Sequence, residues 1–493
     1  MKTITEEHPD FKIFERTIFE IMCLLACQLM RQYLEWRDLA IMALRDTKEY
    51  RLIDSRESTI KTLMGEVRYS RRYYKRRTGG YVFLLDEAMG ISDGYGLVSE
   101  NLAEQIVIES TEKSFRKTSD SISNNTGQRI SAMGAWNVVQ QYGEAIGRQE
   151  ARLQELYDSG STGHLGNKST PVIFEEFDDV HISRQHETRR KKDEILAGKK
   201  KPPKIGKKPM HVGMAYTGWE RTGDGRYLTV DRMAYASFGS SSEFIARFET
   251  LLNNVFDMDG VEQRITNGDG ESWVRTSSET NDTILQLDTY HRNQAVIKAV
   301  AEKADKRDIF KAIREKDVDK AISAISELVF EADDEKAIDK LIGLHSYFDN
   351  NRDILLTWNE RGIELPKPPE GITYRNMGAM ESNNNCLITQ RMKHRKGSWT
   401  ENGANNMAKI LCLRSTIGLD RILGSLPEPE YSEYWLEPLS AAKTPEYDGK
   451  GYGADWLYAE MPFEQAFKTN GREVIRNMLR LKSLSQLPFL QGS

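Results

Sequence analysis

Three carboxylates far apart in the chain are the side chains best suited to chemistry. Asp178 lies toward the end of an apolar segment, Asp269 is flanked by glycines in NGDG, and Glu381 heads a segment rich in amide and basic residues. Taken singly, each has a structural explanation, because acids are common at strand ends and Asn, Asp and Gly favour turns. Taken together, they supply the oxygen ligands that would hold two Mg²⁺ ions for attack on a phosphodiester.

Basic and aromatic side chains follow Glu381 closely. Arg391, Lys393 and Lys396 are suited to positioning phosphate groups. Trp399 either stacks on an unpaired base or fills the core. A carboxylate at the head of a phosphate-binding segment is understandable when metal cations lie between the acid and the phosphate. We therefore predict that these four residues contact DNA beside the metal site.

The carboxylates need rigid elements to bring them together, and the pattern from residue 171 onward predicts such elements. The runs PVIFEEFDDVHIS, MHVGMAYTGWE and RYLTVDRMAYASF predict three strands. An amphipathic helix, a strand, a short helix and a further strand follow. This order matches a ribonuclease-H-like mixed sheet, so the predicted fold class is α/β, with the catalytic domain at 170–295 and 371–425. The polar helical pattern of 296–370 predicts an all-helical insertion, which ends at ELPKPPEG.

The N-terminal part is predicted to be mostly helical and to bind DNA. Residues 1–60 read as a helical region, and 98–155 read as either a helix-turn-helix or a plain helical hairpin. Between them, 61–97 predict a β-hairpin with a Gly-Gly turn. Its first arm interleaves basic residues with tyrosines, which is typical of a charged edge strand or of a nucleic-acid surface. The DNA contacts expected on this arm are Arg71, Arg72, Lys75 and Arg76.

Composition limits the remaining possibilities. A chain of 493 residues is expected to form two or three domains, and its net charge of -5 means that any nucleic-acid contact depends on local charge. One such segment, 184–208, holds eleven Lys or Arg and three acids. Cys23 and Cys27 have helical spacing in an apolar run and read as core residues. Without a secretory signal or a membrane span, we expect a cytoplasmic, nucleoid-associated protein. The sequence of the extension 426–493 does not indicate a function.

Six segments spread over most of the chain carry a resemblance to a known family. They are GEVRYSRRYYKRRTGGYVFLLDEAMG, EEFDDVHISRQ, YTGWE, ITNGDGESWV, LDTYHRNQAV and, most specifically, GAMESNNNCLITQRMKHRKGSWTENGANNMAK. With these segments the chain resembles bacterial insertion-sequence transposases of the ISLre-two type, DDE enzymes distantly similar to the Mutator-like group. The resemblance implies that Asp178, Asp269 and Glu381 are the catalytic residues and the ligands of two Mg²⁺ ions, for which Mn²⁺ can substitute.

The resemblance also marks residues around the three acids. The family usually has Asp-Gly at the first site, whereas Asp179 follows Asp178 here, and the frame from Glu176 favours Asp178 as the ligand. Asp288 and His291 match a motif that lies near the site in these transposases. A helix N-cap is the alternative interpretation of Asp288. Asp179, Asp288 and His291 are therefore expected to surround the ligands.

The activity implied by the resemblance is transposition of double-stranded DNA. Metal-dependent hydrolysis at the transposon end would free a 3′-hydroxyl, which then attacks target DNA. Because such enzymes act on paired DNA ends, a homodimer or a larger oligomer is expected. Two alternatives remain open: a ribonuclease-H-like nuclease that cuts without joining, and a non-catalytic DNA-binding protein derived from a transposase. The intact acids argue against the second alternative.

Overall fold

The structure is a computed structural model. It describes residues 11–91, 98–161, 166–186, 205–380, 385–393 and 397–417. They form two compact units, one up to Gln141 and the other from Tyr142 onward. Glu381, Lys396 and the extension 426–493 lie outside the described residues. Among the described residues, no helix has the length and apolar character needed to cross a membrane.

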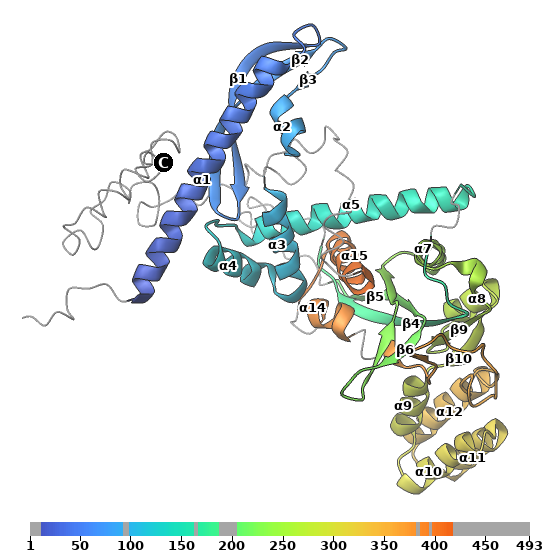
Figure 1. Cartoon of the computed structure of the whole chain (residues 1–493). Coiled ribbons are helices and arrows are strands. Elements are labelled where there is room, and N and C mark those ends of the chain that lie inside the picture. The colour runs from blue at the N-terminus through green and yellow to red at the C-terminus, as the bar shows by residue number, and fades with distance from the viewer. Residues whose placement is uncertain are drawn as a thin grey trace, which may run out of the picture. The chain divides into compact units, whose positions relative to one another are not determined.

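The first unit is built on one long helix and a β-hairpin. Helix α1, Phe11–Leu44, packs along strand β2 (Figure 1). Strand β1, Tyr50–Thr62, pairs antiparallel with β2, Gly65–Arg76, and the short β3, Tyr81–Val82, completes the sheet in the order β1-β2-β3. The buried apolar residues between α1, the hairpin and helix α2, Leu84–Met89, are Leu34, Ile60, Val67, Tyr69 and Leu85.

The hairpin differs from the prediction in its extent and in its main turn. Strand β1 begins at Tyr50, so the range 1–60, which we expected to be helical, ends in a strand. The long strands β1 and β2 turn at residues 63–64, while Gly79 and Gly80 connect β2 to the short β3. Both glycines have positive φ, which explains why they gave the stronger turn signal. The first part of β1 is exposed on both faces, so it lacks the apolar alternation that reveals a strand.

Four further helices follow the hairpin. They are α2, Leu84–Met89; α3, Glu100–Glu112; α4, Phe115–Asn125; and α5, Ala132–Asp158. The turn of the predicted helical pair corresponds to the break near 124–127, which separates α4 from α5. A second break separates α3 from α4, because the side chain of Ser114 accepts the backbone N–H of Lys117 and starts a new helix. The segment therefore contains one more helix boundary than predicted.

A five-stranded mixed sheet forms the centre of the second unit. Its strands are β4, Val172–Ser183; β5, Lys207–Tyr216; β8, Met233–Ser237; β9, Gln263–Gly268; and β10, Ile284–Leu287. They are ordered β10-β9-β4-β5-β8. The pairs β4–β5 and β5–β8 are antiparallel, whereas β9 is parallel to both β4 and β10. The first half of β4 is buried, as expected for the central strand.

Helices cover the sheet and follow its strands in the predicted order. Helix α7, Ser241–Val255, comes between β8 and β9, and α8, Ser272–Thr280, comes between β9 and β10. Both pack on the face of β4 that carries Ile173 and Phe177. Helix α15, Glu401–Ile417, packs against β8.

Smaller elements complete this unit. Strands β6, Gly218–Arg221; β7, Tyr227–Val230; and β11, Ile372–Thr373 form a second antiparallel sheet in the order β11-β6-β7. A 3-10 turn, Met258–Gly260, precedes β9. A π-helical turn, Asn385–Thr389, leads into the short α14, Gln390–Met392.

A helical module follows β10 and has a core of its own. Its helices are α9, Thr289–Ala299; α10, Lys303–Arg314; α11, Val318–Glu331; and α12, Glu335–Asn350. Buried side chains such as Val296, Ile325 and Phe348 lie among them. The range 296–370 was predicted to be all helical. The helices end at Asn350, and the residues that follow, up to β11, contain no regular helix.

Candidate active site

Asp178 and Asp269 lie at matching positions on two neighbouring parallel strands. The last pair of the β4–β9 ladder joins Glu176 to Asn267, and each aspartate is two residues further along its strand or the loop that follows. Asp288 comes directly after β10 in the same way, because Leu287 is the partner of Gly268. Since the carboxyl ends of parallel strands meet at one edge of a sheet, this edge gathers acids that are far apart in sequence.

The environment of Asp269 is partly buried and crowded with charge. Burial raises the pKa of its carboxyl group, and the negative charges of Asp178 and Asp179 raise it further. The backbone N–H of Glu271, 3.1 Å from Oδ1, and the positive charge of His291 oppose that rise. The aspartates therefore lie close enough to repel one another, and a cation between them would relieve that repulsion.

Asp288 and His291 form a pair at the start of α9. The carboxylate of Asp288 accepts the backbone N–H of His291 over 3.0 Å, which makes it the N-cap of the helix, and it also lies 3.0 Å from the ring Nδ1. This hydrogen bond raises the pKa of His291 to about 9, with the charges of Asp178 and Asp269 adding to it. The N-cap interpretation of Asp288 is confirmed, and His291 also lies within electrostatic reach of the two aspartates.

Asp179 is engaged with a different partner from Asp178. Its Oδ1 lies 2.6 Å from Nδ1 of His211 on β5, and the imidazole packs against Trp273 and Phe244 at ring distances of 4.8 and 5.5 Å. Because successive residues of a strand point to opposite faces, Asp178 lies on the other face of β4. This arrangement favours Asp178 as a metal ligand and gives Asp179 the role of a neighbour held by His211.

Glu176 shares the face of Asp178 and is fully buried. It accepts the hydroxyl of Tyr216 over 2.5 Å and three successive backbone N–H groups, those of Gly378, Ala379 and Met380, over 3.3, 3.0 and 2.8 Å. Burial raises the pKa of Glu176, while these four hydrogen bonds oppose the rise. The segment that ends one residue before Glu381 is thereby attached to the strand of Asp178.

The donors at this edge suit a hard divalent cation. Asp178 and Asp269 provide carboxylate oxygens, which Mg²⁺ prefers, and their mutual repulsion favours a bound cation. Among the described residues, no three His, Cys, Asp or Glu side chains are grouped so as to hold a metal ion. Glu381, the third predicted ligand, lies outside these residues. The two described aspartates thus fit a metal site that a further ligand would complete.

The glycines beside Asp269 accommodate the protein itself. A Cβ atom on Gly268 would lie 2.7 Å from the side chain of Val274, and one on Gly270 would lie 2.8 Å from that of Asn351. Gly270 also has a φ of 93°, which favours glycine. Glycines beside an acid can let a backbone and a substrate approach closely. What they allow in the structure is tight packing of α8 and of the residue after α12 around Asp269.

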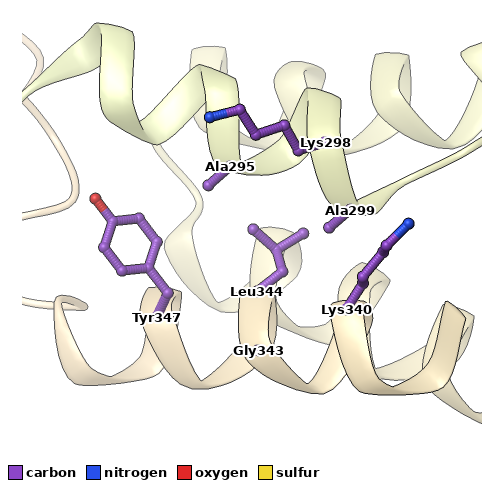
Figure 2. A pocket seen from close by; sticks show the side chains of 7 residues that line it. All are labelled: Ala295, Lys298, Ala299, Lys340, Gly343, Leu344 and Tyr347. Atoms are coloured by element: carbon purple, nitrogen blue, oxygen red, sulfur yellow. The ribbon is translucent and has the colours of Figure 1, made fainter. Parts of the chain in front are cut away.

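Tyr347 connects Asp269 to a groove between α9 and α12. Its hydroxyl donates to the backbone carbonyl of Asp269 over 2.9 Å. Figure 2 shows Tyr347 at one end of the groove, with the side chains of Lys298 and Lys340 along its length. The groove has a volume of about 270 Å³, and its small side chains include Ala295 and Ala299. Both lysines are exposed, so two positive charges flank a groove whose lining residue Tyr347 contacts the backbone of Asp269.

Of the residues after Glu381 that were predicted to contact DNA, only some are accessible to it. Trp399 is buried, and its indole N–H donates to the carbonyl of Met392 over 3.2 Å, which fits the core interpretation instead of base stacking. Arg391 is also buried, with its guanidinium 4.9 Å from the Trp399 ring. Lys393 is exposed, and Lys396 lies outside the described residues. Arg391 and Trp399 are therefore structural residues, because their polar groups face their own chain.

Arg71 of the hairpin is likewise corrected from a DNA contact to a structural residue. Its side chain is 8% exposed and forms an ion pair with Asp86 of α2. Its guanidinium also lies over the ring of Phe83 at 3.8 Å. The fully buried tyrosines Tyr69 and Tyr74 are similarly unable to stack on bases. Burial of alternate residues by α1 and α2 explains why this basic, aromatic strand is less accessible than its sequence suggests.

The other basic residues predicted on β2 differ in accessibility. Arg72 pairs with Asp38 of α1, and Arg76 pairs with Glu87 of α2. Lys75 is exposed and has no ion-pair partner among the described residues. Of the four predicted contacts, Lys75 is the one whose charge is fully available to a phosphate group.

Three residues of the site were missed from the sequence: Glu176, His211 and Tyr347. Glu176 carries a recognisable signal, because an acid inside the apolar run VIFEEF is unusual unless its charge is satisfied. His211 lies in an ordinary strand pattern, and Tyr347 lies in an ordinary helix. Their roles depend on pairing between distant elements, which the local pattern does not encode.

The fold and the site define an α/β protein with paired carboxylates at the edge of a mixed sheet. Residues 4–424 match the uncharacterised protein family UPF0236, so the chain belongs to that family. Two UPF0236 proteins of Caldanaerobacter subterraneus subsp. tengcongensis are each 23% identical to it. One matches over 398 residues, 80% of this chain and 75% of the relative, and the other over 360 residues, 71% and 66%.

A comparison with solved structures gives a weak likeness to the Mos1 strand transfer complex. The sequence identity is 9%, and the match covers 51% of this chain and 76% of the other. The TM-score is 0.13. A score this low carries no argument about fold or function.

Proposed function

We propose that the chain is a DDE transposase that cleaves transposon ends and transfers the freed 3′-hydroxyl into target DNA. The observation that carries the proposal is the pairing of Asp178 with Asp269 at one edge of the sheet. The strand order β10-β9-β4-β5-β8 supports it, because this is the order expected of a ribonuclease-H-like sheet. The resemblance to the ISLre-two type of insertion-sequence transposase supplies the substrate.

The chain's own residues would act by holding and orienting charge. Asp178 and Asp269 would bind the cations, with Glu381 as the third ligand. Bound Mg²⁺ supplies Lewis acidity for attack on a phosphodiester. Asp288 fixes the imidazole of His291 beside both aspartates. A protonated His291 adds one positive charge where two carboxylates and a phosphate would meet.

Two reactions would follow one another at this site. Water attacks the phosphodiester at the transposon end, a P–O bond forms, and the 3′-oxygen leaves and takes up a proton. The resulting 3′-hydroxyl then attacks a target phosphodiester, and the target's 3′-oxygen leaves. Each step exchanges one P–O bond for another, so the same carboxylates can serve both.

The test is excision and joining from a plasmid that carries the element with its native flanking DNA. Purified protein, Mg²⁺ and a second target plasmid should yield cut ends and sequenced junctions in which the element's 3′ end is joined to the target. Asp269→Asn should lose both products and keep DNA binding. Cutting without any joined product would favour a nuclease, and no metal-dependent cutting at all would refute the proposal.

A further inference from the structure

The outer face of α1 carries an apolar stripe along its whole length. Nine large apolar side chains of α1 are 39–85% exposed, and seven of them lie on this stripe: Phe11, Phe14, Ile18, Met22, Tyr33, Trp36 and Leu44. The helix has 34 residues, so the stripe extends over about 50 Å. Exposed apolar patches of this size mark interaction surfaces in soluble proteins.

The stripe repeats every eleven residues. Phe11, Met22, Tyr33 and Leu44 form one column of the repeat. The other two columns are Phe14, Leu25 and Trp36, and Ile18, Leu29 and Ala40. Eleven residues correspond to three turns at 3.67 residues per turn, close to the 3.6 of a straight helix. An apolar column with this period stays on one face, so a second helix can pack along it with little supercoiling.

The charges beside the stripe indicate which way a partner helix runs. Glu15 lies eleven residues before Ala26, Arg37 lies eleven residues after it, and all three fall in the column next to the stripe. In an antiparallel pair centred on Ala26, Glu15 of each copy lies level with Arg37 of the other. A parallel pair would instead place like charges together. The two ends also match in size, because the small Ala40 of one copy would lie level with residue 12 of the other, between Phe11 and Phe14.

The area of the stripe is sufficient for a stable dimer. An aromatic side chain buries roughly 150–250 Å², and Phe11, Phe14, Tyr33 and Trp36 are 41–72% exposed. They would therefore bury roughly 400 Å² in each copy. Covering Ile18, Met22, Leu25, Leu29 and Leu44 as well brings the total toward the roughly 800 Å² per partner of a standard interface.

From this periodicity, charge pattern and area, we infer that α1 is a homodimer interface in which two copies of the helix pack antiparallel about Ala26. The inference is independent of the proposed catalytic function, since it concerns the first unit alone. It gives the expected oligomer a specific contact surface.

The first test measures the mass of the full chain without DNA by light scattering and sedimentation over a range of concentrations. The wild type should be a dimer. Met22→Gln with Trp36→Gln should raise the dissociation constant at least about a hundredfold, because both are large stripe residues that are more than half exposed in the single copy. The matched control is Ile13→Gln with Leu39→Gln, which removes two equally exposed apolar side chains outside the three columns and should leave the dimer intact.

The second test addresses direction. Arg37→Glu should weaken the antiparallel dimer on the order of tenfold, since two attractive pairs become repulsive. Adding Glu15→Arg should restore it. A monomeric wild type would overturn the inference, and so would a dimer that the stripe variant leaves intact. A dimer indifferent to Arg37→Glu would overturn the antiparallel arrangement.

Discussion

The carboxylate of Glu176 accepts the backbone N–H of Met380 over 2.8 Å, and so attaches the chain one residue before Glu381 to the strand that carries Asp178. The same carboxylate accepts the N–H groups of Gly378 and Ala379. Burying a carboxylate without a cationic partner costs free energy. The three backbone hydrogen bonds offset part of that cost and hold residues 378–380 in place beside the strand of Asp178.

Replacing Glu176 with Gln should reduce stability and the proposed cleavage together. The amide keeps the size of the side chain but turns one acceptor into a donor, so a backbone N–H loses its partner. We expect the free energy of unfolding to fall by about 1–3 kcal/mol, measured by urea denaturation. Tyr216→Phe, which removes only the hydroxyl, should cost about 1 kcal/mol. A Glu176→Gln variant as stable as the wild type would contradict this account.

Asp178 and Asp179 should respond differently to replacement by Asn. Loss of a residue that merely surrounds a metal site typically costs 10–100-fold in activity or metal affinity. Asp179→Asn should fall in that range, because His211 holds its carboxylate on the opposite face of β4. Asp178→Asn should lose more than about a hundredfold. Mg²⁺-dependent cleavage and Mg²⁺ titration of each variant provide the measurement, and the reverse order would transfer the ligand role to Asp179.

Much of the sheet could be predicted from the sequence, because its strands are short apolar runs separated by clear turns. The order of the main-sheet strands and helices from 171 to 295 agrees with the structure, and so does the helical module that follows. Two predicted strands are divided, however: MHVGMAYTGWE contains β5 and β6, RYLTVDRMAYASF contains β7 and β8, and β6 and β7 belong to the second sheet. Strand β1 could not be predicted in the same way. Its first residues are exposed on both faces, and its pairing with β2 depends on contacts that no local pattern encodes.

The acids of the candidate site could be predicted from the sequence, whereas the residues around them were harder to predict. The strand pairing brings Asp178 and Asp269 together as expected, since both follow apolar strands that lie side by side. The DNA contacts were harder, because a basic residue in a strand has the same sequence signal whether it is exposed or paired. Arg71 and Arg391 are both buried against their own unit. Only their tertiary neighbours distinguish them from Lys75.

The Asp288–His291 pair should make stability depend on pH. The pKa of His291 is raised from 6.5 to about 9, chiefly by the hydrogen bond that its ring donates to Asp288. Its contribution is therefore complete below about pH 6.5 and is lost as the pH rises through 9. The unfolding free energy of the wild type should fall by about 1–2 kcal/mol over this window because of His291, given that the ring is partly exposed. His291→Gln should remove that fall. Urea denaturation in EDTA between pH 6 and 9.5 measures it.

Asp288→Asn is the control for this pH dependence. It removes the charge that raises the pKa of His291 and keeps a side chain able to cap α9. The profile of this variant should also be flat, although His291 is present. If Asp288→Asn retained the wild-type profile, another group would be responsible for the fall above pH 7.

The groove between α9 and α12 should contribute to DNA binding under the proposed function. Lys298 and Lys340 lie along it and would each neutralise one phosphate. Replacing both with Gln should reduce the slope of log affinity against log salt by about 1.8 on duplex DNA, as measured by fluorescence anisotropy in EDTA. Lys311→Gln with Lys320→Gln removes the same charge where both lysines pair with Glu315. That control should leave the slope close to the wild-type value.

The basic residues of the hairpin should divide into those that stabilise the fold and those that bind DNA. Arg71→Ala breaks the buried pair with Asp86 and leaves an uncompensated charge, so the first unit should lose about 3–5 kcal/mol of stability. Lys75→Ala removes an exposed charge, so unfolding should change by less than about 0.5 kcal/mol while the salt slope of DNA binding falls by about 0.9. Thermal unfolding and anisotropy titrations on both variants decide the assignment. If Lys75→Ala left DNA binding and its salt slope unchanged, the exposed side of β2 would not face DNA, and the hairpin's basic residues would serve the fold alone.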